Sequence, residues 1–255
     1  MPLSDEQVRD NDRRFLRDFL SLGAAVHRYT AIGLYHEAQR IPSDQSIKAE
    51  DGPYIQTSLR AKIFAEAVAS METVGKLAYA VRNRRSDGIA CRYVRGTEAH
   101  SENGLRLFRQ PRTHLLSALD IPMDASLPSD AHESALAAMS TSMHLLYLAY
   151  LAPAPSGREG KQIVEAYRAI KHGSNLVADP RTVSIWPRAA TKGHVWMLTK
   201  WPLRAEGNDQ LDIKEIGMSQ DSVLSNIEMC KLADVMCKNL CQLVIYLLDA
   251  GSLPY

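Results

Sequence analysis

Arg168 and His172 stand four residues apart in the segment EAYRAIKHGS, so both fall on one side of a helix that stops at Gly173. A histidine exchanges a proton near neutral pH, and an arginine supplies a fixed cation for phosphate oxygens. The pair therefore has the residue types that metal-free cleavage of a phosphodiester needs. An ordinary helix end explains the same residues, because a glycine commonly follows the last turn and His172 complements the negative end of the helix dipole. The spacing leaves both interpretations open.

An arginine-rich segment lies earlier in the chain. Residues 82–112 hold eight arginines and no lysine, opposed by three carboxylates. Arginine binds phosphate or carboxylate through planar, bidentate contacts, and Tyr93 and Phe108 supply rings on which bases can stack. The arginines predicted to bind phosphate are Arg82, Arg84, Arg85, Arg92, Arg109 and Arg112. The alternative is pairing with another subunit or with carboxylates elsewhere in the chain, such as Asp209, Asp212 and Glu215.

The elements that must position these residues are mostly helices. Apolar residues recur at three- and four-residue steps over 5–39, where Gly23 and Gly33 are points of bending, and over 55–85. β-Branched and aromatic residues after Pro180 predict a β-hairpin that pairs 182–186 with 194–201. Further helices are predicted over 98–108, over 112–119, from 130, from 156 to 172, and over 219–248.

These elements predict one mainly α-helical domain over 1–255, a helical bundle with a small β-hairpin between the last two long helices. Residues 86–128 are predicted to be an irregular, arginine-rich elaboration, and 182–201 a β-hairpin insertion. The composition agrees with a globular chain, since 45% of the residues are hydrophobic and 23% are charged.

Composition also narrows the function. The net charge of +1 gives no overall electrostatic attraction to nucleic acid or to an anionic membrane. The polar N-terminal residues do not resemble a signal peptide, and the apolar runs are shorter than the roughly 20 residues of a membrane-spanning helix. We therefore expect a cytoplasmic protein without membrane contact, whose four cysteines are reduced.

Motifs for bound groups are absent from the sequence. It holds no G-x-G-x-x-G, no P-loop, no G-x-S-x-G and no Glu-x-x-His pair of the di-iron type. Cys230, Cys237 and Cys241 fall on the apolar face of the last helix, as core cysteines do. The sequence therefore predicts neither a cofactor nor a metal.

The long helix FAEAVASMETVGKLAYAVRNR, the later helix ending in YRAIKHG, the small β excursion and the long last helix together resemble HEPN-type helical proteins. The resemblance covers 55–86 and 129–250. It implies a helical bundle, a homodimer, and metal-independent cleavage of RNA by an Arg and a His separated by four to six residues. The resemblance equally includes helical relatives of these enzymes that are binding modules and lack the Arg–His pair.

The spacing of that family is met in two places other than EAYRAIKHGS, where three residues separate the Arg from the His. RGTEAH supplies Arg95 and His100, and RQPRTH supplies Arg109 and His114. The catalytic candidates are Arg168 with His172 and Arg95 with His100, the histidine acting as acid or base and the arginine stabilising phosphate charge.

Three functions remain open on the sequence, and whether the chain is an enzyme is one of the open points. The first is RNA binding or metal-independent RNA cleavage, in a defence or toxin–antitoxin context. The second is a non-catalytic helical module that binds a protein partner or a small ligand. The third is a metal-free enzyme acting on a small molecule in a pocket under 86–128.

Overall fold

The computed structural model describes residues 3–85, 87–108, 114–122, 134, 136–139, 141–142, 176–179, 194–199, 212–217 and 220–255. For the three stretches between 176 and 217, and for 220–222, it describes the backbone alone. The described residues are mainly helical, as the sequence predicts. Within this part of the chain, every helix is too short or too polar to cross a bilayer.

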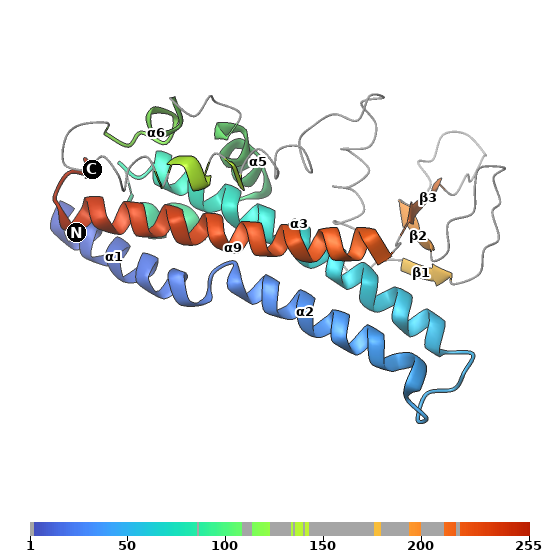
Figure 1. The fold of residues 1–255 in the computed structure, drawn as a ribbon. Helices are drawn as coiled ribbons and strands as arrows, with labels where there is room; N and C mark the ends of the chain where they lie inside the picture. Colours follow the sequence, from blue (N-terminus) through green and yellow to red (C-terminus); the bar gives the residue numbers. More distant parts are fainter. Residues whose placement is uncertain are drawn as a thin grey trace, which may run out of the picture. The chain divides into compact units, whose positions relative to one another are not determined.

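The elements follow the sequence pattern closely. The helices are α1 (Asp5–Leu22), α2 (Ala25–Arg40), the 3₁₀ turn η1 (Ile41–Ser43), α3 (Gly52–Arg82), α4 (Ile89–Val94), α5 (Glu98–Leu107), α6 (Leu115–Ala118) and α9 (Gln220–Asp249). The strands are β1 (Leu176–Asp179), β2 (His194–Thr199) and β3 (Asp212–Gly217). Figure 1 shows their order along the chain.

Local signals set the ends of the first helices. Ser4 and Gln7 form a capping box that starts α1. Gly23 ends it, because its N–H bonds to the carbonyl of Phe19 and a new helix begins two residues later. Of the two predicted bending points, Gly23 interrupts the helix, whereas Gly33 lies within α2.

The contacts group the chain into two compact units. Unit 1 comprises residues 1–26, 69–151 and 229–255, and unit 2 comprises 27–68 and 152–228. The prediction of a single domain over 1–255 stays a prediction.

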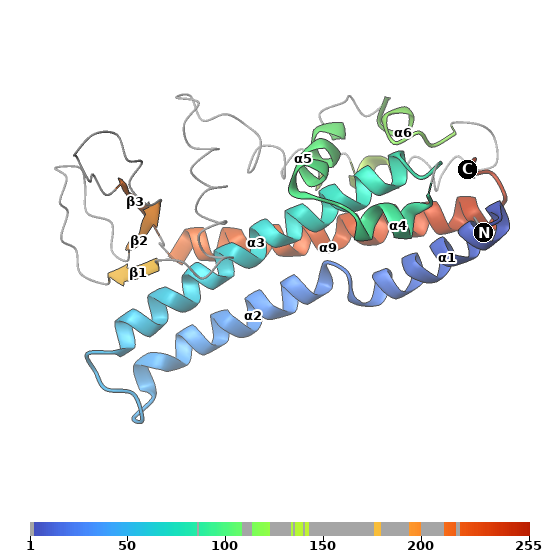
Figure 2. The same ribbon diagram turned by 180° about the vertical axis from the view of Figure 1, so that it is seen from behind.

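In unit 1, α1 runs antiparallel to the end of α9 (Figure 1). Arg13 fixes this arrangement, because its Nη2 donates to the carbonyl of Leu248 at 2.8 Å and its Nε lies 3.0 Å from the carboxylate of Asp249. Figure 2, the view from behind, shows α4 and α5 beside the second half of α3. The helices of unit 1 thus pack around one helical core.

That core uses the faces that the apolar periodicity predicts. In the part of α3 that belongs to unit 1, the predicted stripe from Met71 to Val81 is buried, and in α9 the three cysteines of the apolar face are buried with Val244 and Leu248. The predicted stripe of the first helices is different, because Leu22 and Val26 on it are exposed. The break at Gly23 ends the continuous helix on which that stripe was drawn.

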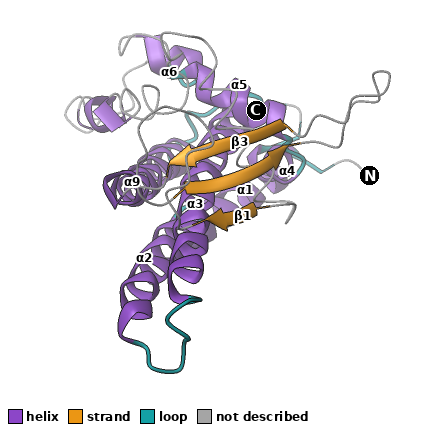
Figure 3. Cartoon of the chain, turned by 90° about the vertical axis from the view of Figure 1, so that its right-hand side faces the viewer, coloured by secondary structure: helices purple, strands orange, loops and turns teal. Residues whose placement is uncertain are grey.

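Unit 2 contains an antiparallel sheet of the three described strands, in the order β1–β2–β3 (Figure 3). Val177 and Glu215 lie opposite Trp196, on either side of it. The predicted hairpin uses β2 as one arm, but its other arm, 182–186, lies outside the described residues, so this hairpin stays a prediction. In the helical part, Gln56 donates to the carbonyl of Ala38 at 2.9 Å and joins α2 to α3.

Candidate functional site

Two glycines bring α3 and α5 into backbone contact. A Cβ on Gly75 would overlap the carbonyl oxygen of Ser101, and a Cβ on Gly104 would overlap the carbonyl oxygen of Gly75. The two helices are antiparallel at this crossing, so the residues one turn away, Tyr79 on α3 and His100 on α5, also meet. Backbone contact of this kind leaves little freedom to slide, and it therefore fixes where His100 lies.

His100 has two structural partners. Its ring stacks on Tyr79 with 4.3 Å between centroids and 15° between planes. It also completes a capping box with Thr97, whose side chain accepts from the His100 backbone N–H at 3.4 Å and whose backbone N–H donates to His100 Nδ1 at 3.1 Å. In a neutral ring, an Nδ1 that accepts this hydrogen bond requires the proton to be on Nε2.

Arg95 stands two residues before Thr97, at the end of α4. Its side chain is 71% exposed, and its ion partner, Asp87, lies 3.7 Å away and also pairs with Arg92 at 3.1 Å. A shared, solvent-screened contact of this length holds a guanidinium weakly. The α4–α5 connection therefore carries an accessible cation five residues before His100, which is the third residue of α5.

Chemically, this connection can bind an anion. A guanidinium gives bidentate hydrogen bonds to phosphate oxygens, and a neutral imidazole gives one more through Nε2–H. The RGTEAH segment, one of the two predicted places, thus combines an exposed arginine and a positioned histidine. Sequence reasoning missed the cap, because Thr97 is a favoured N-cap residue but is followed three residues later by His100 and not by the Glu or Gln of the usual signature.

Several other candidates lie outside the described residues. These are Arg168, His172, Arg109 and Arg112. His114 is described and exposed at the start of α6. Arg82 is exposed on the last turn of α3 and forms no ion pair with another residue of the described part.

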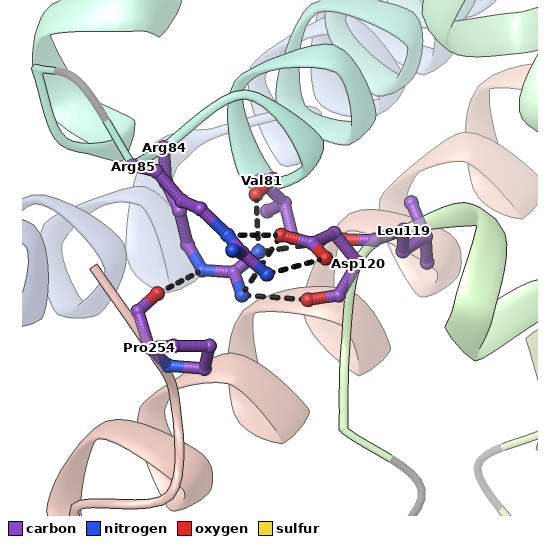
Figure 4. Close-up of polar contacts among 6 residues, drawn as sticks. All are labelled: Val81, Arg84, Arg85, Leu119, Asp120 and Pro254. Carbon is purple, nitrogen blue, oxygen red and sulfur yellow. Dashed lines mark hydrogen bonds and ion pairs between the residues drawn. The ribbon is translucent and has the colours of Figure 1, made fainter.

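Arg84 points inward, and its side chain is 0% exposed. Its guanidinium donates to the backbone carbonyls of Val81 (2.8 Å), Leu119 (3.5 Å), Asp120 (2.6 Å) and Pro254 (3.1 Å), as Figure 4 shows. Burial lowers the pKa of Arg84, and the nearby Asp120 carboxylate, 3.6 Å away, opposes that shift. Each of the three guanidinium nitrogens donates to at least one backbone carbonyl. In this arrangement the Arg84 guanidinium binds backbone carbonyls of the protein and does not face a ligand.

Asp120 also binds the neighbouring arginine. Arg85 donates hydrogen bonds to both carboxylate oxygens of Asp120, at 2.7 and 2.8 Å (Figure 4). Asp120 adopts a left-handed backbone conformation, with φ of 55°. On α5, Arg106 pairs with Glu102. Arg84, Arg85, Arg92, Arg95 and Arg106 thus have carboxylate partners among Asp87, Glu102 and Asp120. The side chains of the suggested acids at 209, 212 and 215 lie outside the described part of the structure.

The rings proposed for base stacking are engaged in packing. Tyr93 contacts Phe15 and Phe19 at centroid distances of 5.2 and 5.1 Å, and Phe108 is buried. Burial, together with the neighbouring Cys237, raises the pKa of Tyr93 to about 12. Burial also raises the pKa of Cys241 to about 12. These groups belong to the core of unit 1.

A buried carboxylate was not foreseen from the sequence. Asp12 is 1% exposed and accepts from the first two backbone N–H groups of α4, Ile89 at 2.7 Å and Ala90 at 2.9 Å. The Tyr255 hydroxyl donates to it at 2.6 Å. Burial and this hydrogen bond raise the pKa of Tyr255. Asp12 therefore caps α4 across a long sequence separation, which a periodicity argument cannot detect.

Comparison with protein-family models, with curated proteins and with solved structures finds no match to this chain. Among the residues that the structure describes, the α4–α5 connection combines an exposed arginine, Arg95, with a positioned histidine, His100.

Proposed function

We propose that the chain is a cytoplasmic, HEPN-like helical protein that acts as a homodimer and binds or cleaves RNA without a metal. The fold proposed with it includes the hairpin over 182–201. The observation that supports an RNA function best is the α4–α5 connection. There Arg95 is exposed, five residues before a histidine whose ring is held by Thr97 and Tyr79.

The chemistry follows from the two side chains. The Arg95 guanidinium balances the charge on a phosphate. To do so it gives up only its ion pair with the Asp87 carboxylate, which is weak because it spans 3.7 Å and is exposed to solvent. His100 adds a hydrogen bond from Nε2–H. RNA presents its phosphates along a single strand or a helix alike, so such a site reads the backbone and not the sequence. The same groups would also stabilise charge if the strand were cut.

The first experiment measures RNA binding by fluorescence anisotropy and RNA cleavage in EDTA. Arg95→Ala and His100→Ala are compared with wild type, and Arg106→Ala is the matched control, since it removes an exposed arginine on α5 that pairs within its own helix. We expect binding to weaken by about tenfold in the first two variants and to stay unchanged in the control. His172→Ala tests the other pair, and a loss of cleavage there alone would assign proton transfer to His172.

Two results would contradict the proposal. One is a wild-type protein that neither binds nor cleaves single-stranded or structured RNA at low salt, where phosphate contacts are strongest. The other is binding that Arg106→Ala weakens as much as Arg95→Ala does, since this would indicate a diffuse charge effect.

A second function, binding to a protein partner, is favoured by the exposed apolar pair at the α1–α2 junction. Leu22 is 66% exposed and Val26 is 49% exposed. Large contiguous apolar patches commonly mark interaction sites, and these two residues would contribute to such a patch at the α1–α2 junction. The double variant Leu22→Ser/Val26→Ser should abolish dimerisation, or capture of a partner, in light scattering and pull-down assays. An unchanged mass and partner profile would remove this function.

A further inference from the structure

We infer that His100 meets RNA as a fixed hydrogen-bond donor through Nε2, while its Nδ1 is reserved for capping α5, so that His100 binds phosphate and does not act as a general base. Thr97 and Tyr79 are then positioning residues. The inference rests on the proposed function, but its central claim, the position of the ring proton, can be measured without RNA.

The cap selects the tautomer. A capping box usually has Glu or Gln three residues after the N-cap, and either one offers an oxygen that accepts from the N-cap backbone. A neutral histidine at that position accepts only through an unprotonated nitrogen. Here the Thr97 backbone N–H donates to Nδ1 at 3.1 Å, so the proton resides on Nε2. A base needs a free lone pair, and in this geometry the lone pair of Nδ1 is already engaged.

The stacking on Tyr79 fixes the plane of the ring. The two rings are 15° from parallel, at 4.3 Å, and the glycine crossing of α3 and α5 holds their helices together. Rotating the imidazole to present Nδ1 outward would break the bond from Thr97. Among the described residues nothing bonds to Nε2, which leaves its N–H for an external acceptor.

The nature of that acceptor follows from the neighbours. Arg95 precedes the cap by two residues and is the exposed cation of the same connection. A guanidinium and an imidazole N–H are both donors, so together they suit an acceptor with several anionic oxygens, such as an RNA phosphate. Neutral imidazole acting as a donor is an established role for histidine. Proton transfer, where cleavage occurs, falls to another group.

Substitutions at His100 separate the donor role from the base role. Gln and Glu both complete a capping box, so His100→Gln and His100→Glu form a matched pair that preserves the start of α5. Gln keeps an outward N–H donor when its oxygen takes the cap, whereas Glu presents a carboxylate. We expect His100→Gln to bind a fluorescent single-stranded RNA within about threefold of wild type and His100→Glu to bind at least about tenfold more weakly.

The tautomer is measured by NMR on protein labelled with ¹⁵N at histidine, without RNA and at a pH where the ring is neutral. The expected spectrum shows a protonated Nε2 and an unprotonated Nδ1 for His100. A protonated Nδ1 overturns the inference. So does RNA binding in which His100→Gln is as weak as His100→Glu while both retain the circular dichroism of wild type.

The two proposals fail in different ways. If wild type does not bind RNA but Nδ1 is unprotonated, the RNA function is wrong and the role of Thr97 in fixing the tautomer stands. If wild type binds RNA but Nδ1 is protonated, the RNA function stands and the donor role of His100 is wrong.

Discussion

The guanidinium of Arg84 donates a hydrogen bond of 3.1 Å to the carbonyl oxygen of Pro254, 170 residues further along the chain. The same side chain reaches the carbonyls of Leu119 and Asp120 at the end of α6. One buried arginine therefore joins the end of α3, the end of α6 and the segment after α9. Removing the Arg84 side chain should therefore weaken the packing of all three segments.

Arg84→Met replaces the buried cation by an apolar side chain of similar length. We expect the free energy of unfolding to fall by about 3 kcal/mol, because several buried carbonyl oxygens lose their donor. Arg85→Met is the matched control. Arg85 is 59% exposed, and its loss should cost less than about 1 kcal/mol. Urea denaturation followed by circular dichroism measures both, and equal losses would contradict a structural role specific to Arg84.

The glycine crossing predicts opposite effects for two Gly→Ala substitutions within helices. Gly75→Ala places a methyl group against the backbone of Ser101, so we expect a loss of about 1–3 kcal/mol. At Gly33 a methyl group meets nothing within 4 Å, and the lower backbone entropy of alanine in the unfolded chain should stabilise α2 by about 0.5–1 kcal/mol. Thermal unfolding distinguishes them. Stabilisation by Gly75→Ala would show that α5 does not contact α3 as described.

Much of the helical fold could be predicted from the sequence. The predicted helix over 219–248 appears as Gln220–Asp249, the one over 98–108 as Glu98–Leu107, and the one over 55–85 as Gly52–Arg82. In each case a local signal sets the element, either apolar periodicity or a turn residue. The short helix α4 was missed, because its cap is Asp12, far away in the sequence.

The candidate site was only partly predictable. The spacing of Arg95 and His100 was visible, but their partners were not, since stacking on Tyr79 depends on a crossing of two helices. The burial of Arg84 was missed for the same reason. Its neighbours, Arg82 and Arg85, are exposed, and only the packing of α3 against α6 and the segment after α9 distinguishes the three.

The buried tyrosine hydroxyl of Tyr93 and the buried thiol of Cys241 predict that unit 1 loses stability at alkaline pH. The pKa values of Tyr93 and Cys241 rise from 10.0 and 9.0 to about 12 on folding, so the folded chain retains protons that the unfolded chain has released. Stability from these groups is complete below pH 9 and falls as the pH rises from 9 to about 12. Each group contributes a slope of up to about 1.4 kcal/mol per pH unit.

Urea denaturation between pH 8 and 11 measures this slope. Tyr93→Phe removes one titrating group and should flatten the curve above pH 10, although it also removes a hydrogen bond with Thr73 and so lowers stability at every pH. Cys241→Ala should flatten the curve from pH 9. If the free energy of unfolding fell with pH at the same rate in wild type, Tyr93→Phe and Cys241→Ala, the two side chains would not be buried as described.

The four cysteines should react with a thiol reagent in two classes. Cys91 is partly exposed, whereas Cys230, Cys237 and Cys241 are buried, and burial raises the pKa of Cys237 well above its ordinary value. Because the thiolate is the reactive form, we expect one rapid equivalent per native chain and three more on denaturation. Cys91→Ser should abolish the rapid phase. Rapid reaction of more than one thiol would contradict the packing of α9.

Unit 1 is assembled from three separate stretches of chain, and this has a consequence for its biosynthesis. A ribosome adding about 5–20 residues per second makes Pro254 roughly 10–30 s after Arg84. Until then, Arg84 and Asp12 are without Pro254 and Tyr255, and α1 is without the end of α9. α1 therefore remains without its partner α9 during this interval, and we expect a chaperone that holds nascent chains to matter most at that time.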